Sequence, residues 1–265
     1  MKNKKIAIIG GGNLGSSIAE GLIKSAFVKP EEVMVTRRQI EKLEALKKSG
    51  IQVTRDNAEA IRNSEVIIVA IKPYNVKAVL TELKEVFDPA RHLVISVVTG
   101  FSLQDLASII DHGVPLFRAM PNTAIAIQES VTCICQQGAT EEQVVYVNQL
   151  FNQLGITVPI EEHLMDAATV LGACGIAYAL RFIRAATQGG IEIGFDSKTA
   201  NLIAAQTVKG SAELLLKLNR HPEEEIDKVT TPKGCTIAGL NEMEHQGFSS
   251  SLIKGICVSY EKIGT

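Results

Sequence analysis

A run of glycines directly behind a short apolar segment is the feature that most constrains the fold of this chain. Residues 5–9 form a short β-rich run that is apolar from Ile6 to Ile9. Residues 10–15 read Gly-Gly-Gly-Asn-Leu-Gly, and helical spacing of apolar side chains follows. In such a strand–loop–helix, Gly10 permits a tight turn, Gly12 lets a pyrophosphate approach the backbone, and Gly15 allows close helix–strand packing. Glycine-rich turns without function are common, but this context predicts a dinucleotide site at Gly10, Gly11, Gly12, Asn13, Leu14 and Gly15.

Strand and helix signals alternate through the first 160 residues. Apolar runs at residues 66–71 and 93–98, the second interrupted only by Ser96, suit parallel strands that are covered on both faces. Capping patterns at residues 102–105 and 140–143 are typical of helix starts. Repeated β-α units predict an α/β fold in residues 1–160, with a Rossmann-type, doubly wound parallel sheet and right-handed crossovers. Further strands are expected at residues 32–36, 116–119 and 131–135, and helices at residues 14–23, 39–48, 75–87, 102–110 and 140–154.

Residues 161–265 form the second predicted domain, which is all-helical. Its helical stretches are interrupted by breakers such as Gly189-Gly190 and Pro232. Two long stretches, residues 167–186 and 199–218, are Ala-rich and apolar on more than one side, so they need burial on several faces. We therefore expect a homodimer through this half, or a larger homo-oligomer built from it; a self-sufficient helical bundle is the alternative.

Charge and composition narrow the partners. The formal net charge of −2 and an aromatic content of 5% give no sign of a surface for nucleic acid. The N-terminal apolar run is too short for a signal peptide or a membrane span, so we expect a cytoplasmic protein with no membrane partner. The five cysteines form no CxxC pair and suit reduced thiols. Cys133 and Cys135 share one face of an expected strand; a metal pair is an alternative there, but buried strand residues are the expectation and no metal site is predicted.

The end of the second strand indicates which dinucleotide binds. A site for NAD usually places an acidic residue there to bind the ribose 2′-hydroxyl. This chain instead has Thr36, Arg37 and Arg38, and two guanidiniums suit the 2′-phosphate of NADP because Arg offers paired donors to phosphate oxygens. A solvated turn with two arginines is the alternative. We predict NADP(H) as the cofactor, with NAD(H) left open.

A polar, nearly uncharged stretch, VTTPKGCTIAGL at residues 229–240, interrupts the helical half. Pro232 and Gly234 mark a loop, and the apolar residues that resume at Ile237 and Leu240 mark a new helix. Exposed backbone N–H groups that lead into a helix N-terminus predict a site for a carboxylate or a phosphate.

Several motifs in one order resemble the pyrroline-5-carboxylate reductase family along nearly the whole chain. They are IIGGGNLGSSIAEGL, AIKPYNV, FRAMPNTAIAI, DAATVLGACGIAY and VTTPKGCTIAGL. The resemblance implies a Rossmann domain followed by a helical domain that interlocks two subunits, commonly in larger oligomers. It also implies NADPH-dependent reduction of 1-pyrroline-5-carboxylate to L-proline, by hydride transfer to the carbon of a cyclic imine.

The resemblance also implies roles for individual residues. Substrate contacts fall on Glu162, Gly234, Cys235 and Thr236, with the hydroxyl of Thr236 bonded to the ring nitrogen as the catalytic group. Val97, Val98 and Thr99 border the nicotinamide, as do Met120, Pro121 and Asn122. The other cofactor contacts are the glycine loop, Thr36, Arg37, Arg38, Asn57, Ala70, Ile71, Lys72 and Pro73.

For four of these assignments, a purely structural role or no functional role is the alternative. Asn57 and Thr236 could each cap a helix, Lys72-Pro73 could be an ordinary strand-end turn, and Glu162 could be a solvated linker carboxylate.

Two departures from the family pattern leave the substrate open. Lys233 stands where a glycine is usual, so a positive φ there would carry a steric cost, or its ammonium would add a cation beside the substrate carboxylate. Cys235 replaces another small residue. Ala173-Cys174-Gly175-Ile176, after Gly172, replaces the usual Ser-Gly-Ser-Gly-Pro. Reduction of another cyclic imine is one alternative function, and a catalytically weak NADP(H)-binding relative that acts through its helical dimer surface is another.

Overall fold

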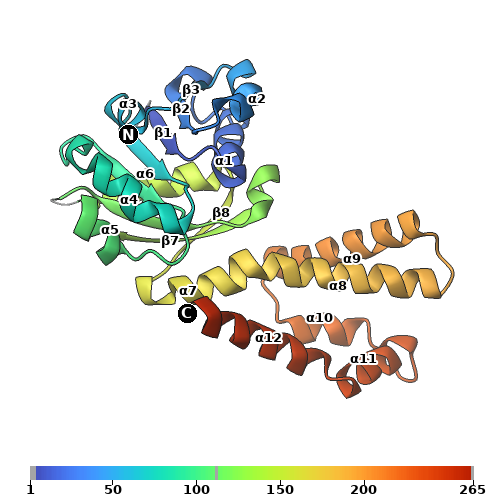
Figure 1. Cartoon of the computed structure of the whole chain (residues 1–265). Helices are drawn as coiled ribbons and strands as arrows, with labels where there is room; N and C mark the ends of the chain where they lie inside the picture. Colours follow the sequence, from blue (N-terminus) through green and yellow to red (C-terminus); the bar gives the residue numbers. More distant parts are fainter. Residues whose placement is uncertain (1–3, 111–112, 264–265) are drawn as a thin grey trace. The chain divides into compact units, whose positions relative to one another are not determined.

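The structure, a computed structural model, describes residues 4–110 and 113–263. Backbone contacts divide the chain into two compact units (Figure 1). One consists of Met1–Cys174 with Ile263–Thr265, and the other of Gly175–Lys262. The first unit therefore extends beyond the boundary expected at residue 160.

The first unit is built on one sheet of eight strands in the order β3-β2-β1-β4-β5-β6-β7-β8. This order and the helices on both faces confirm the predicted doubly wound α/β fold. The strands are β1 Ile6–Ile9, β2 Val33–Thr36, β3 Gln52–Thr54, β4 Val66–Val69, β5 Leu93–Ser96, β6 Leu116–Met120, β7 Ser130–Gln137 and β8 Gly155–Pro159.

Side chains alternate along the strands and pack into two separate hydrophobic cores, one on each face of the sheet. On β1, Ile6 and Ile8 pack with the core that includes Leu22, whereas Ala7 and Ile9 belong to the opposite core. Helices α1 Asn13–Lys24, α2 Glu44–Lys48 and α6 Glu141–Asn152 contribute to the first core. Helices α3 Asn57–Arg62, α4 Pro73–Leu83, α5 Leu103–Ile110 and α7 Met165–Ala168 contribute to the second.

One strand pairing differs from the expected all-parallel sheet. β6 and β7 are antiparallel, whereas every other neighbouring pair is parallel. Parallel neighbours need a crossover of a dozen or more residues. The connection from Met120 to Ser130 is shorter and holds only the 3-10 turn η4 Thr123–Ile127, so the chain reverses direction there.

Both predicted helix starts are confirmed as reciprocal caps. The hydroxyl of Ser102 accepts from the Asp105 N–H at 3.0 Å, and the Asp105 carboxylate accepts from the Ser102 N–H at 2.9 Å. Thr140 and Gln143 make the same exchange at the start of α6. Cys133 and Cys135 both lie on β7, as expected, and burial raises the pKa of both thiols, that of Cys135 to about 11.

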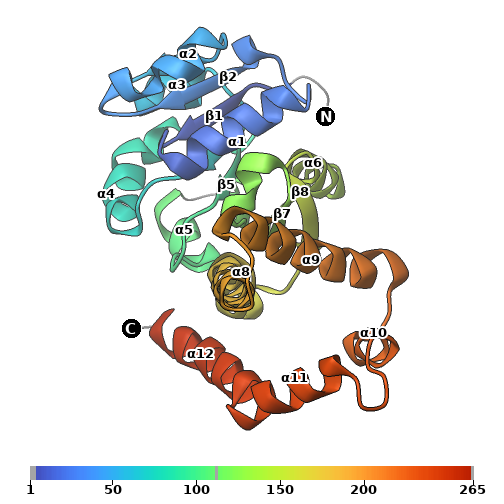
Figure 2. The ribbon, with the colours of Figure 1, turned by 90° about the vertical axis from the view of Figure 1, so that its right-hand side faces the viewer.

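Residues 161–263, as far as the structure describes them, contain no strand, in agreement with the predicted helical half. A π-helical segment, Thr169–Cys174, separates α7 from α8. Gly189-Gly190, expected to break a helix, lies inside α8, where a Cβ on Gly190 would lie 3.1 Å from the Cβ of Ala200. Glycine there lets α8 and α9 approach closely (Figure 2). The helices are α8 Gly175–Glu192, α9 Ser197–Leu218, α10 Pro222–Lys228, α11 Cys235–His245 and α12 Phe248–Ile263.

The helical unit buries very little of its own apolar surface. Among its described residues only Thr187, Ala200 and Ala204 are buried. Leu202 on α9 and Ile253 on α12 are 68% and 61% exposed. The longer helical stretch Glu162–Glu192 is apolar enough to cross a membrane by length and composition alone, a test that core helices of soluble proteins also meet. These helices therefore present a large apolar surface that a single chain does not cover.

Candidate cofactor and substrate sites

The glycine loop between β1 and α1 requires glycine at its first and last positions. Gly10 has φ +113°, and a Cβ there would lie 2.6 Å from the carbonyl oxygen of Ala70. A Cβ on Gly15 would lie 2.2 Å from the carbonyl oxygen of Gly10. Around Gly12, in contrast, no atom lies within 4 Å of such a Cβ. The loop is therefore closed against β4 and α1 but open at Gly12, as the predicted approach of a pyrophosphate requires.

The start of α1 offers unoccupied hydrogen-bond donors beside that open position. Gly12 is the N-cap residue of this 12-residue helix, and no side chain among the described residues caps it. The first backbone N–H groups of a helix have no intrahelical partner, and they carry the positive end of the helix dipole. These features fit the pyrophosphate of a dinucleotide.

The end of β2 holds the loop from the other side. The Gly10 and Gly11 N–H groups donate to the side-chain and backbone oxygens of Thr36, at 3.2 and 2.7 Å. Nη1 of Arg37 donates to the Gly11 carbonyl at 2.6 Å, whereas Arg38 is exposed and makes no hydrogen bond or ion pair within the described residues.

The first acidic residue after β2 is already paired. Glu41 lies 3.7 Å from Arg55, so its carboxylate is engaged by another cation. The local charge therefore suits a phosphate better than a ribose hydroxyl.

Two further predicted cofactor segments follow β3 and β4. Asn57 is the first residue of α3, but Asp56 caps that helix, accepting from the Ala58 and Glu59 N–H groups at 2.8 and 3.1 Å. The capping alternative for Asn57 is therefore wrong. Ala70, Ile71, Lys72 and Pro73 connect β4 to α4, and Pro73 occupies the first helical position.

The predicted nicotinamide segments, which follow β5 and end β6, lie next to each other. Val97 and Val98 are buried, whereas Thr99 is exposed and its Oγ1 lies 3.8 Å from Met120 Sδ. Pro121 is buried as well.

Asn122 links the end of β6 to the π-helical segment. Its side-chain oxygen accepts from the Ala124 N–H at 3.0 Å, and its amide donates to the Gly172 carbonyl at 3.3 Å. Gly172 directly precedes residues 173–176, which depart from the family pattern. Asn122, a predicted cofactor residue, is therefore bonded at the start of that segment.

Glu162 has partners that the sequence did not indicate. Its Oε1 accepts from the Leu103 N–H at 2.5 Å and from Arg118 Nη1 at 3.1 Å. The Arg118 side chain is only 5% exposed. The solvated-linker alternative for Glu162 is therefore wrong. Sequence reasoning missed Arg118, although a charged residue inside the apolar strand segment LFRAM is a visible signal.

The predicted substrate loop, residues 229–236, forms a tight turn that leads directly into α11. The Gly234 N–H donates to the Thr231 carbonyl at 2.9 Å, and a Cβ on Gly234 would lie 2.5 Å from Thr231 Oγ1. Lys233 has φ +58°, the left-handed conformation that a glycine adopts without strain. Helix α11 begins at Cys235, earlier than the sequence indicated.

In the part of the chain that the structure describes, the start of α11 has no side-chain cap either. Gly234 is its N-cap residue, and Thr236 is half-buried at the second helical position. The capping alternative for Thr236 is therefore wrong, and the first N–H groups of α11 are free of a side-chain partner.

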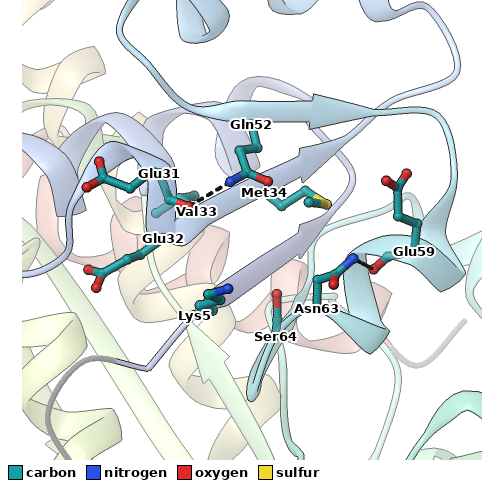
Figure 3. A pocket seen from close by; sticks show the side chains of 9 residues that line it. All are labelled: Lys5, Glu31, Glu32, Val33, Met34, Gln52, Glu59, Asn63 and Ser64. Carbon is teal, nitrogen blue, oxygen red and sulfur yellow. Dashed lines mark hydrogen bonds between the residues drawn. The ribbon is translucent and has the colours of Figure 1, made fainter.

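A separate cavity of about 180 Å³ lies at the opposite edge of the sheet from the glycine loop. Its residues lie just before or within the first half of β1, β2 and β3, or within and directly after α3, whereas the glycine loop follows the end of β1 (Figure 3). None of the predicted site residues lines it. The lining residues are Lys5, Glu31, Glu32, Val33, Met34, Gln52, Glu59, Asn63 and Ser64.

The doubly wound sheet, the open glycine loop and the free arginine beyond β2 define a dinucleotide-dependent oxidoreductase. Residues 162–264 match the family model for pyrroline-5-carboxylate reductase dimerisation, and residues 5–100 match that for NADP oxidoreductase, coenzyme F420-dependent. The chain belongs to the pyrroline-5-carboxylate reductase family.

Curated relatives support the assignment of the chain to this family. Pyrroline-5-carboxylate reductase 2 of Dictyostelium discoideum is 45% identical over 98% of this chain and 92% of that protein. Reductase 1 of the same organism is also 45% identical, but this chain spans only 49% of its length. The Methanosarcina acetivorans enzyme is 35% identical over 99% of this chain and 97% of that protein.

Solved structures agree with the fold. Plasmodium falciparum pyrroline carboxylate reductase, with NADP bound, is 27% identical with a TM-score of 0.90, covering 100% of both chains. The Coxiella burnetii enzyme is 26% identical with a TM-score of 0.91, covering 99% of this chain and 98% of that one.

Proposed function

We propose that this protein reduces 1-pyrroline-5-carboxylate to L-proline with NADPH. The observation that carries the proposal is the 45% identity to pyrroline-5-carboxylate reductase 2 of Dictyostelium discoideum, over 92% of that relative's length. NADPH, when bound, supplies the hydride. The intact glycine loop and the retained Thr236 support an active enzyme rather than a relative that only binds the cofactor.

The front unit would hold the dinucleotide through three groups of residues. Backbone N–H groups of residues 13–15, at the start of α1 beside Gly12, bind the pyrophosphate. Arg38, with the free donors of Arg37, binds the 2′-phosphate. Asn57 and residues 70–73 make the remaining contacts with the nucleotide. Residues 97–99 and 120–122 border the nicotinamide, where they exclude water from the reacting face.

The start of α11 would hold the substrate. Its free N–H groups, near Gly234 and Cys235, bind the substrate carboxylate at the positive end of the helix dipole. The hydroxyl of Thr236 bonds the ring nitrogen and orients the imine. An unperturbed hydroxyl is a poor proton donor, but an imine is most electrophilic when it is already protonated, so strong general acid catalysis is not required.

The helical unit would pair with the same unit of a second chain. The support is its apolar surface, including Leu202 and Ile253, together with the family's dimerisation model over residues 162–264. A homodimer is the smallest assembly that covers such a surface, and larger homo-oligomers can be built from it. The five cysteines are all free, which suits a reducing compartment such as the cytoplasm.

One assay separates this function from its alternatives. The purified protein is given NADPH and a panel of cyclic imines, with and without a carboxylate and with five- and six-membered rings. Turnover restricted to the five-membered imino acid is the expected result, and preferred turnover of another imine would replace the proposed substrate. NADPH binding without any turnover would indicate the weak relative. Thr236→Ala should lower kcat, Thr236→Ser should retain most of it, and no effect of Thr236→Ala would contradict its assigned role.

A further inference from the structure

We propose that Glu162, held by Arg118, is a positioning residue that fixes the two strand ends beside the nicotinamide, and that it does not act by touching the substrate. This rests on the proposed function, which assigns residues 97–99 and 120–122 to the nicotinamide. The geometry that points to it is a single carboxylate oxygen, Glu162 Oε1, which bonds both α5 and β6.

The bond to α5 fixes the connection that follows β5. Leu103 is the first residue of α5, and its N–H donates to Glu162 Oε1 at 2.5 Å. The cap between Ser102 and Asp105 holds the same helix start. A carboxylate is favoured at this end of the helix dipole. Glu162 therefore determines where residues 97–102 lie.

The bond to Arg118 fixes the end of β6. Arg118 and Met120 lie on the same face of the strand because side chains alternate. The Arg118 guanidinium is almost fully buried, and within the described residues its Nε has no hydrogen-bond partner. Without Glu162 this buried cation would lose its ion-pair partner, so the strand would shift to hydrate it.

The segment that follows Glu162 is bonded at one end to β6 and at the other to the residues directly after β6. It starts at the Arg118 ion pair, is anchored by Met165, which is fully buried, and reaches the Gly172 carbonyl that accepts from Asn122. Arg118 lies within β6 and Asn122 directly follows Pro121 after its end. Loss of the first bond would therefore also displace the second, and with it a residue assigned to the nicotinamide.

The expected consequence is a loss of rate with little loss of cofactor affinity. Displacement of reacting groups by about 1 Å costs on the order of 100-fold in rate. NADPH affinity depends largely on its phosphates, which the proposed function assigns to the ends of β1 and β2. Glu162 instead bonds α5 and β6.

The test compares Glu162→Ala and Glu162→Gln with the wild-type full chain. It measures kcat, the KM of the imine, the Kd of NADPH and the fluorescence emission of bound NADPH, which reports the surroundings of the nicotinamide. The chain has no Trp to obscure that signal. Glu41→Gln is the matched control, because Glu41 pairs with Arg55 on the exposed surface.

For Glu162→Ala we expect at least a tenfold lower kcat, an NADPH Kd within threefold of wild type and a changed emission. Glu162→Gln should lower kcat less than Glu162→Ala does, because its amide oxygen still accepts from Leu103 and Arg118. A raised imine KM with unchanged emission would instead make Glu162 a direct substrate contact. Wild-type kcat and emission in Glu162→Ala would also overturn the proposal.

A second variant keeps the test decisive if Glu162→Ala fails to fold. The double variant Arg118→Met/Glu162→Met removes the buried charge together with its partner, a replacement that folded proteins often tolerate. The low kcat and the changed emission should persist in it, whereas wild-type values would show that the pair serves stability alone. The emission and the Kd do not depend on the imine, so they test the positioning role even if the proposed substrate is wrong.

Discussion

Nη1 of Arg37 donates to the carbonyl oxygen of Gly11 at 2.6 Å, which gives two neighbouring arginines different roles. Arg37 holds the glycine loop in place, together with the hydrogen bonds that the Gly10 and Gly11 N–H groups donate to Thr36. Arg38 remains exposed and free within the described residues. We therefore expect the recognition of the 2′-phosphate to depend mainly on Arg38, and the shape of the loop to depend on Arg37.

Arg38→Ala should raise the KM for NADPH roughly 10- to 100-fold, because charge-assisted hydrogen bonds are worth about 1.5–3 kcal/mol. The KM for NADH should change little, since NADH lacks the 2′-phosphate. Arg37→Ala should raise the KM for both cofactors, because it releases the glycine loop that both of them use. Steady-state kinetics with each cofactor measure this, with Arg62→Ala, on the exposed end of α3, as the control. Equal turnover efficiency with NADH in the wild type would contradict the NADP assignment.

The fold was predictable wherever the local signal was strong. Four-residue strands that are buried on both faces, such as Val66–Val69 and Leu93–Ser96, appear in the sequence within apolar runs, of which the second contains only Ser96 as a polar residue. Two strands at the edges of the sheet were missed. Gln52–Thr54 is only three residues long, and Gly155–Pro159 exposes Ile156 and Val158, so neither carries a clear apolar pattern.

The site was predictable in its local motifs but not in its long-range partners. The glycine loop and its arginines lie within short, recognisable patterns. The pairing of Glu162 with Arg118 joins residues that are 44 positions apart, and no local pattern contains both. The positive φ of Lys233 was expected only conditionally, from the glycine that the family places there, and the structure shows it.

Stability should fall in mild acid because of a buried histidine, His92. Its Nδ1 accepts from the Asp88 N–H at 2.9 Å, which requires the neutral imidazole. Burial, helped by Arg91, lowers the pKa of His92 below its usual 6.5, against the opposing charges of Asp88 and Glu65. The unfolded chain therefore binds a proton more readily than the folded one, so this stability is present above pH 6.5 and lost as the pH falls below it.

Urea unfolding between about pH 7 and pH 5 checks this contribution. The wild-type free energy of unfolding should decrease over that interval, and His92→Gln should decrease less, because its amide oxygen can still accept from Asp88. His163→Gln, which changes an exposed histidine, serves as the control and should keep the wild-type slope. An identical slope in His92→Gln would show that His92 does not carry the effect.

Leu202→Glu should convert the assembly to single chains. Leu202 is 68% exposed on α9, so a carboxylate costs nothing in an isolated chain but would be desolvated in an apolar interface between two chains. Size-exclusion chromatography with light scattering measures the mass. Val145→Glu, which places the same charge at a half-exposed position of α6 in the other unit, should leave the mass unchanged. A wild-type mass for Leu202→Glu would remove α9 from the interface.

Lys233→Gly should maintain or raise stability, because it replaces a side chain held at φ +58°. The left-handed conformation costs roughly 1–2 kcal/mol for a residue with a Cβ, and the extra freedom of glycine in the unfolded chain offsets about 0.5–1 kcal/mol. The net gain in the free energy of unfolding should be about 1 kcal/mol or less. Lys254→Gly is the control: within α12 it should lose about 1 kcal/mol, because glycine is a poor helix former.

Lys233→Ala separates the charge of this residue from its backbone. It removes the ammonium but keeps the cost of the left-handed conformation, so its stability should match that of the wild type. If the ammonium assists the substrate carboxylate, both Lys233→Ala and Lys233→Gly should raise the KM of the imine several-fold, while the KM for NADPH stays constant. An unchanged imine KM in both variants would mean that Lys233 contributes only strain to the turn, and that the N–H groups at the start of α11 hold the carboxylate without it.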